Sequence, residues 1–229
     1  MGLNNLRNYI RTSKRPLDVI YVLDVSGSME GEKILSVNRA MHELETELLK
    51  EAQRNPGTSV NITVVTFGND VAKIHGSSKV AIEHYHYSDI NYVIGSTPFD
   101  KACYVLCDLL SEQNMDPKSY TPVVVLLSDG EPSYEYENAL NQFLSSKWGA
   151  KAIKYAIACG DDADRGVLAR FTTSAECVLS VNNATELIRA IKWTSSLVSK
   201  SSKIGYTNDK PDSVMTRPTS IIDNDDYWY

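Results

Sequence analysis

The sequence predicts an α/β domain in which helices cover both faces of a doubly wound, mainly parallel sheet. Two patterns predict this class. Short apolar runs rich in β-branched residues recur along the chain, as expected for strands buried on both faces. Between them lie segments whose apolar residues recur every three or four positions, as on one face of a helix. Their alternation predicts a three-layer α/β/α arrangement with one antiparallel edge strand.

Strands are expected wherever an apolar run is bounded by turn residues. The first run lies between Pro16 and a Ser-Gly-Ser turn, and Pro122 begins the most apolar run of the chain. The third run returns beside the second after a Gly-Asn-Asp turn, so these two strands should pair antiparallel. In chain order, the expected strands are residues 18–24, 60–67, 71–74, 122–128, 152–158 and 177–180.

Helices are expected where the apolar spacing changes to three or four residues. The longest of these segments stops at Asn55-Pro56-Gly57, a sequence that ends helices. Pro98 is well placed to begin another, because proline is favoured in the first turn. In chain order, the expected helices are residues 31–54, 98–112, 136–148, 165–171 and 185–198.

These elements divide the chain into a 1–16 extension, a 17–199 domain and a 200–229 tail. The tail has no periodicity and is expected to be flexible. Its last residues, 223–229, are acidic and aromatic. We interpret them as a solvated end, with docking onto a neighbouring copy or a partner as the alternative.

Composition narrows the functional classes. The chain has 229 residues, of which 42% are hydrophobic, enough for one substantial core. A net charge of −6 argues against general nucleic-acid binding. No segment resembles a secretory signal or reaches the roughly 18 apolar residues of a membrane span. The four cysteines form no Cys-x-x-Cys pair and are interpreted as reduced core residues. A cytoplasmic protein without membrane contact is expected.

Oxygen-bearing side chains follow two of the predicted strands, and another lies directly before a predicted helix. The first strand ends in Asp24-Val-Ser26-Gly-Ser28, the most apolar strand runs into Asp129, and Thr97 precedes a helix. Ligands of doubly wound sheets bind outside the carboxyl ends of the strands, so these side chains should meet at one edge. Two carboxylates and three hydroxyls are hard ligands that suit Mg²⁺, with Mn²⁺ or Ca²⁺ as alternatives.

This pattern resembles the metal-ion-dependent adhesion site (MIDAS) of von Willebrand factor A domains, whose signature is Asp-x-Ser-x-Ser with a distant Thr and a distant Asp. The resemblance covers about residues 17–199. It implies that Ser26, Ser28 and Thr97 coordinate the cation directly. It also implies that Asp24 and Asp129 do so directly or through water, and that an acidic side chain of a protein partner completes the shell.

Within this superfamily, the early motif and the phrase Leu-Leu-Ser-Asp-Gly-Glu-Pro-Ser, residues 126–133, look most like bacterial tellurium-resistance-associated (TerY-like) proteins. That resemblance implies a cytosolic protein-binding module in a stress-response system, with a kinase or phosphatase as a candidate partner. The approach to Thr97 departs from the usual glycine-rich pattern, since only Gly95-Ser96 precede it.

Tyrosines on both sides of the predicted site form a candidate partner-binding rim, because tyrosine supplies large, stiff contact area at interfaces. Covering the core is the alternative role for them. The candidates are Tyr85, Tyr87, Tyr92, Tyr134 and Tyr136.

Two other functions compete with the binding module. The five oxygen side chains could instead cap helices and bond to backbone amides in a metal-free scaffold. Alternatively, Asp24 could be the nucleophile of a metal-dependent phosphohydrolase, since it follows the first strand. Such enzymes use a second Asp two residues later and a nearby Lys. Ser26 occupies the position of that second Asp, and the residues directly after Asp129 offer no lysine. No enzymatic activity is therefore expected.

Overall fold

The computed structural model describes residues 14–129 and 131–204. The N-terminal extension before residue 14, Gly130 and the acidic-aromatic segment 223–229 lie outside the described residues. Within residues 14–129 and 131–204, no helix combines the length and the apolar character needed to cross a membrane.

A seven-stranded mixed sheet forms the centre of the fold, in the order β3-β2-β1-β5-β6-β7, with β4 also paired to β2. The pairs β2–β1, β1–β5, β5–β6 and β6–β7 are parallel, and β3 and β4 run antiparallel to β2. The strands are β1 Arg15–Asp24, β2 Thr58–Gly68, β3 Val71–Ile74, β4 Val80–Ala81, β5 Val123–Ser128, β6 Ile153–Cys159 and β7 Val178–Val181.

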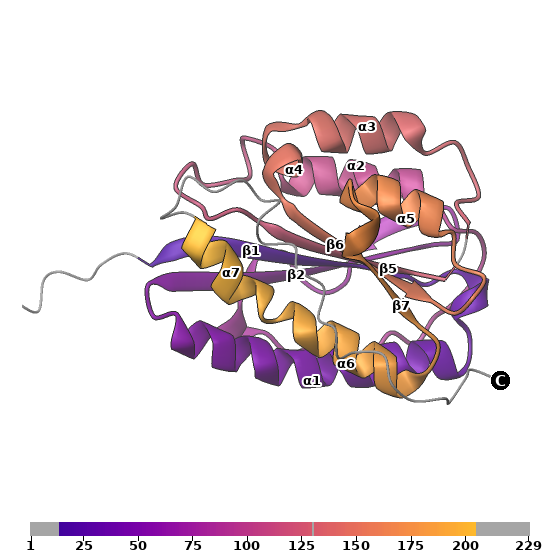
Figure 1. Cartoon of the computed structure of the whole chain (residues 1–229), viewed down its shortest axis with the longest axis horizontal. Coiled ribbons are helices and arrows are strands. Elements are labelled where there is room, and N and C mark those ends of the chain that lie inside the picture. Colours follow the sequence, from indigo (N-terminus) through magenta and orange to yellow (C-terminus); the bar gives the residue numbers. More distant parts are fainter. Residues whose placement is uncertain (1–13, 130, 205–229) are drawn as a thin grey trace, which may run out of the picture.

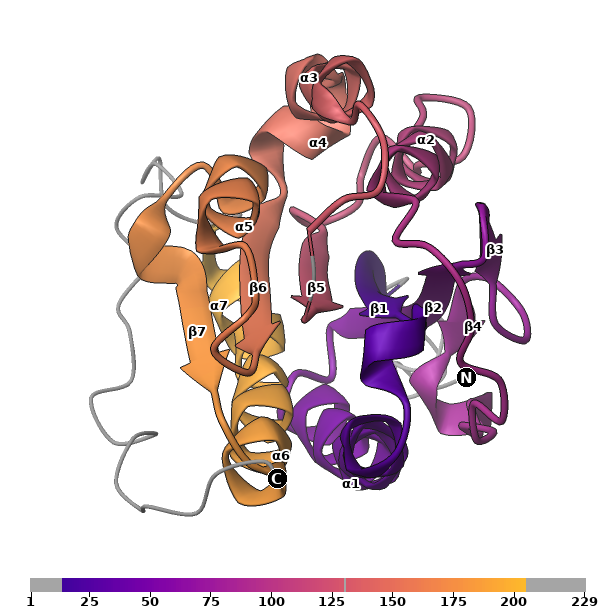
Figure 2. The ribbon, with the colours of Figure 1, turned by 90° about the vertical axis from the view of Figure 1, so that its right-hand side faces the viewer.

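Helices cover both faces of this sheet (Figure 1). Helices α1, α6 and α7 lie on one face and α2 to α5 on the other, as the end-on view in Figure 2 shows. The predicted three-layer α/β/α fold with a mainly parallel sheet is confirmed. The helices are α1 Glu32–Arg54, α2 Phe99–Leu109, α3 Glu137–Ser145, α4 Lys147–Lys151, α5 Arg165–Thr172, α6 Ala184–Thr194 and α7 Leu197–Ile204.

The central strand β1 shows why the sheet needs two helical layers. Its side chains alternate between the faces, because successive side chains of a strand point in opposite directions. Val19 and Tyr21 pack in the core under α1 and α6, whereas Ile20 and Val22 pack in the core under α2 and α3. All four are fully or almost fully buried. Burial on both faces makes β1 a continuous apolar run in the sequence.

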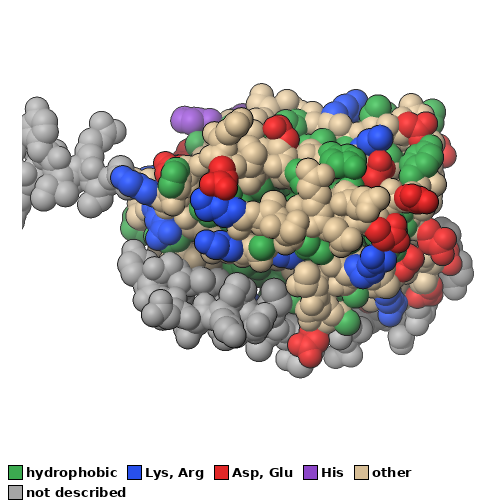
Figure 3. All heavy atoms as spheres, turned by 90° about the horizontal axis from the view of Figure 1, so that it is seen from above, with side chains coloured by type: hydrophobic (Ala, Val, Ile, Leu, Met, Phe, Trp, Pro, Cys, Tyr) green, Lys and Arg blue, Asp and Glu red, His purple; other side chains and the backbone are tan. Residues whose placement is uncertain are grey.

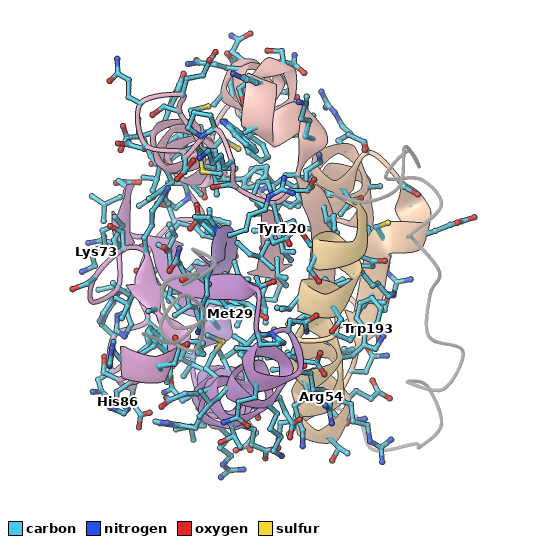
Figure 4. The ribbon with its side chains drawn as sticks, turned by 90° about the vertical axis from the view of Figure 1, so that its left-hand side faces the viewer. Met29, Arg54, Lys73, His86, Tyr120 and Trp193 are labelled. Atoms are coloured by element: carbon cyan, nitrogen blue, oxygen red, sulfur yellow. The ribbon has the colours of Figure 1, made fainter. Side chains whose placement is uncertain are left out.

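Two aromatic contacts join distant segments of this framework. At the amino end of the sheet, the Arg15 guanidinium lies over the Tyr120 ring, 4.1 Å from its centroid. Farther along, the Trp193 ring of α6 meets the Tyr155 ring of β6 edge-on, with 4.9 Å between centroids. Figure 4 labels Tyr120 and Trp193, which come from segments far apart in the chain. These contacts leave the carboxyl edge of the sheet to its loops.

Three predicted elements differ from the structure. The segment 136–148 contains two helices, α3 and the start of α4, separated at the extended Ser146, whose side chain accepts a hydrogen bond from Gly149 N. The segment 185–198 also contains two helices, which are separated at Ser195-Ser196. The second of them, α7, continues to Ile204, past the expected domain end at residue 199. The two-residue strand β4 adds a second antiparallel pairing to the expected edge strand β3.

Candidate metal centre

The candidate site lies where the strand order reverses. Strand β1 lies between β2, which follows it in the chain, and β5, and ligands of doubly wound sheets bind outside the carboxyl ends of the strands at such a point. Asp24 is the last residue of β1, and Ser128 is the last residue of β5. The Ser128 hydroxyl donates to Asp24 Oδ2 at 2.6 Å. The topology therefore brings the predicted ligands of both strands to one edge.

A tight turn after β1 gathers the first three predicted ligands. Asp24 Oδ1 accepts a hydrogen bond from Ser26 N at 2.9 Å. A short 3₁₀ helix then runs from Gly27 to Met29, and its Met29 N donates to Ser26 O. Met29 is fully buried and packs with the residues of α1, as its position in Figure 4 shows. This anchor keeps the exposed Ser28 at the edge of the sheet.

Hydroxyl groups connect this turn to the second carboxylate. Ser26 Oγ lies 3.1 Å from Ser28 Oγ, and Ser28 Oγ donates to Asp129 Oδ1 at 2.6 Å. Neighbouring ligands of an octahedral Mg²⁺ ion, at about 2.1 Å from the metal, are separated by about 3 Å. The spacing of the two serine hydroxyls matches one edge of such an octahedron. The donor set is also suitable, since it consists of hard oxygen atoms.

Thr97 lies in the adjoining loop, and backbone contacts hold this loop against the turn. Gly27 N donates to Gly95 O at 3.1 Å. Thr97 N donates to Ser133 Oγ at 2.8 Å, and Ser133 N donates back to Thr97 O at 3.0 Å. Thr97 itself is buried. The three loops after β1, before α2 and after β5 are therefore tied together.

Burial makes the charge of Asp24 costly. Removal from water raises the pKa of the Asp24 carboxyl to about 6. Hydrogen bonds from Ser128 and Ser26 oppose this rise, and the negative charge of Asp129 adds to it. A nearby cation would stabilise the charged form of such a buried carboxylate. The described residues hold no group of three or more His, Cys, Asp or Glu side chains that could bind a metal. Any ion here would therefore depend on the hydroxyls.

Two contributors to the site were not predicted from the sequence. Lys33, on the first turn of α1, donates from Nζ to Asp129 Oδ2. The residues directly after Asp129 contain no lysine, as the sequence shows, but the fold brings Lys33 to Asp129 from 96 positions earlier in the chain. Ser133 forms hydrogen bonds with both the backbone N and the backbone O of Thr97. In the sequence, Ser133 stood out only as part of the phrase 126–133 that carries the family resemblance. Neither Lys33 nor Ser133 belongs to a sequence pattern that indicates its role in the site.

The predicted tyrosine rim is wrong for two of its five members. Tyr85 and Tyr87 are buried and pack in the core beside α1. The Tyr87 hydroxyl donates to Asn38 Oδ1 at 2.8 Å, which satisfies it inside the protein. The alternative role, covering the core, holds for both residues. The apolar residues Ile82 and Ile90 of the same segment are buried with them, so the whole segment covers α1.

The other three tyrosines lie nearer the surface. Tyr134 is half exposed, and its hydroxyl donates to Asp70 Oδ1. Tyr136 packs against Phe99, with 5.6 Å between ring centroids. Tyr92 lines a cavity of about 80 Å³ that also touches Val25, the residue between Asp24 and Ser26. Tyr92, Tyr134 and Tyr136 therefore stay candidates for contact with a partner.

The fold and the site together define a doubly wound α/β domain with an oxygen-rich site at its switch point. Residues 18–192 match the von Willebrand factor type A domain family, and the chain belongs to this family. It is also 26% identical over 168 residues to the human inter-alpha-trypsin inhibitor heavy chain H6. That match covers 68% of the chain but 12% of the human protein, so the likeness concerns one domain of a much longer protein.

Solved structures with the same fold include adhesive and matrix proteins. Proximal thread matrix protein 1 from the mussel byssus superposes with a TM-score of 0.59 and 17% identity, over 81% of this chain and 48% of that one. The pilus adhesin SpaC from Lactobacillus rhamnosus GG superposes with a TM-score of 0.64 and 14% identity, over 80% of this chain and 30% of that one. A further structure of the mussel protein is described as having a zinc-occupied MIDAS motif, with a TM-score of 0.55, 18% identity and coverage of 81% and 46%. These likenesses establish the fold.

Proposed function

We propose that this domain binds a protein partner through a divalent cation held in a MIDAS by Asp24, Ser26, Ser28, Thr97 and Asp129. The observation that carries the proposal is the continuous contact from Ser26 through Ser28 to Asp129, which joins two loops distant in the chain. Helix capping alone does not require that contact. The zinc-occupied MIDAS of a protein with this fold supports the same assignment. Mg²⁺ is the proposed ion because all five donors are oxygen atoms.

The proposed partner supplies an Asp or Glu carboxylate to the bound cation. Two carboxylates balance a divalent ion, so the ion can still attract one further anionic oxygen. The exposed Tyr134 and the half-buried Tyr92 lie on loops beside the site and would contact the surroundings of that carboxylate. Domains of this family commonly mediate protein–protein interaction, which agrees with this role.

A phosphohydrolase that uses Asp24 as its nucleophile is not supported by the geometry. Asp24 is completely buried, and both of its oxygens already accept hydrogen bonds, from Ser26 N and Ser128 Oγ. A nucleophile needs an oxygen that faces the substrate. Lys33 supplies the nearby ammonium group that such enzymes use, but the position of the general acid remains Ser26.

A cytoplasmic, bacterial role of the tellurium-resistance type, with a kinase or phosphatase as partner, is the narrowest part of the proposal. The sequence phrase 126–133 supports it, and so do four free cysteines, of which three are buried. A pull-down from bacterial lysate with Mg²⁺ and with EDTA tests it. Retention of a kinase or phosphatase only with Mg²⁺ supports this role, and its absence from both contradicts it.

Thermal unfolding with EDTA or with excess MgCl₂ tests the metal site. A ligand at 100 times its Kd stabilises the folded state by about 2.7 kcal/mol, which raises the Tm of a domain of this size by about 5–10 °C. We expect this rise in the wild type and not in Asp129→Asn. Asp89→Asn is the matched control, because Asp89 is half exposed and pairs with His42 instead. A Tm that Mg²⁺ and Mn²⁺ leave unchanged, with or without added acetate, contradicts the proposal.

A further inference from the structure

Asp129 divides its two oxygens between different parts of the site. Oδ1 accepts from Ser28 Oγ at 2.6 Å, on the side of the hydroxyl cluster. Oδ2 accepts from Lys33 Nζ. The Asp129 side chain is fully buried, and that of Lys33 is 22% exposed, so this ion pair is only partly open to water. An ion pair in this position is stronger than one on the surface.

Lys33 reaches Asp129 without entering the hydroxyl cluster. A Cβ atom built at Gly160, just after β6, would lie 3.8 Å from Lys33 Nζ. The ammonium group therefore lies between α1 and the loop after β6, whereas Ser26 and Ser28 belong to the loop after β1. Lys33 therefore contacts Asp129 on a different oxygen from the one that faces the serine hydroxyls.

We infer that Lys33 is a built-in counter-cation that weakens divalent-cation binding at this site and strengthens the binding of an acidic ligand to the loaded site. This inference rests on the proposed function. Asp24 and Asp129 together neutralise a divalent ion, and the Lys33 ammonium adds one positive charge. Repulsion between the two cations lowers the metal affinity. The excess positive charge then adds to the attraction between the loaded site and the carboxylate of the partner.

A role in positioning alone would predict the opposite result. If Lys33 served only to orient Asp129, its removal would loosen Asp129 and weaken metal binding. If Lys33 acts through its charge, its removal makes metal binding tighter. The sign of the change in Kd therefore separates the two roles.

Isothermal titration with MgCl₂ alone, on the full chain, is the test. We expect Lys33→Met to bind Mg²⁺ at least about tenfold more tightly than the wild type, because one nearby unit charge is worth 1.4 kcal/mol or more against a divalent ion. Lys33→Arg keeps the charge and should retain the wild-type affinity. The affinity of acetate for the Mg²⁺-loaded protein should fall in Lys33→Met and stay unchanged in Lys33→Arg.

Lys50→Met is the matched control. It makes the same change on the same helix, about 25 Å away and well beyond a Debye length of about 8 Å. This variant should match the wild type in both titrations. Equal or weaker Mg²⁺ binding by Lys33→Met overturns the inference while the proposed function stands. Absence of Mg²⁺ binding from both the wild type and Lys33→Met overturns the proposed function, and the inference with it.

Discussion

Asp24 combines the least accessible position in the site with a charge that the site must compensate. Because its pKa is raised from 3.8 to about 6, the folded protein binds a proton over this range more tightly than the unfolded chain does. Protonated Asp24 therefore stabilises the metal-free fold below about pH 4, and this contribution is lost as the pH rises through 6. At neutral pH, a bound cation would compensate the negative charge of the buried Asp24 carboxylate.

Asp24→Asn tests this account. The amide can still accept from Ser26 N and can donate to Ser128 Oγ, so both hydrogen bonds are kept. Two pKa units correspond to about 3 kcal/mol, so metal-free Asp24→Asn should be more stable than the metal-free wild type by about 1–3 kcal/mol at pH 7. The difference should shrink toward pH 4, and Mg²⁺ should stabilise the variant little. Urea unfolding in EDTA measures it, and a less stable variant at pH 7 contradicts the account.

At the scale of residues, the sequence indicated the oxygen ligands better than their surroundings. Asp24, Ser26 and Ser28 follow a recognisable strand within five positions, so a local pattern is enough to find them. Lys33 reaches Asp129 across 96 positions of the chain, and no local pattern encodes that contact. Tyr85 and Tyr87 look like surface tyrosines of a loop, but their hydroxyl-bearing rings pack beside α1.

At the scale of elements, the loop before α2 sets the position of Thr97. Gly95 has a φ of +76°, and a Cβ there would lie 2.9 Å from Asn69 Cα. Neither the backbone conformation nor the space suits another residue. The same loop accepts a hydrogen bond from Gly27 N through Gly95 O, so a shift at Gly95 would separate it from the turn after β1.

Gly95→Ala should therefore lose Mg²⁺-dependent stabilisation as well as fold stability. Gly76→Ala is the control, because Gly76 has a similar φ of +80° but nothing within 4 Å of a Cβ. We expect about 1 kcal/mol of destabilisation from the backbone conformation in both variants and a further 1–3 kcal/mol in Gly95→Ala. Thermal unfolding with and without Mg²⁺ compares them. Equal Mg²⁺ responses in the two variants would show that this loop does not set the site.

The elements also show where periodicity stops being informative. The apolar spacing is continuous across Ser146, so it predicted one helix where the structure has α3 and α4. The interruption comes from the Ser146 side chain, which caps α4, and from Gly149, where a Cβ would lie 2.1 Å from Phe143 O. Strand β4 has only two residues, too few for an alternating pattern.

At the scale of the whole molecule, the order of strands and helices was predictable because each parallel strand is buried on both faces. Their order in the sheet was not, since pairing depends on contacts between distant segments. Charge is also unevenly distributed: acidic side chains gather toward the carboxyl edge of the sheet in Figure 3. Exposed acids there include Asp70, Glu131 and Asp161. Such an edge concentrates cations near the candidate site.

The most direct test of the central claim is an anomalous difference map from crystals grown with MnCl₂. The account predicts one strong peak at coordination distance from Ser26 Oγ, Ser28 Oγ and Thr97 Oγ1, near Asp24 and Asp129, with Lys33 still on Asp129 Oδ2. Crystals of Asp129→Asn should lack this peak. A map with no peak at this edge of the sheet, or a peak that leaves the two serine hydroxyls uncoordinated, would contradict the account.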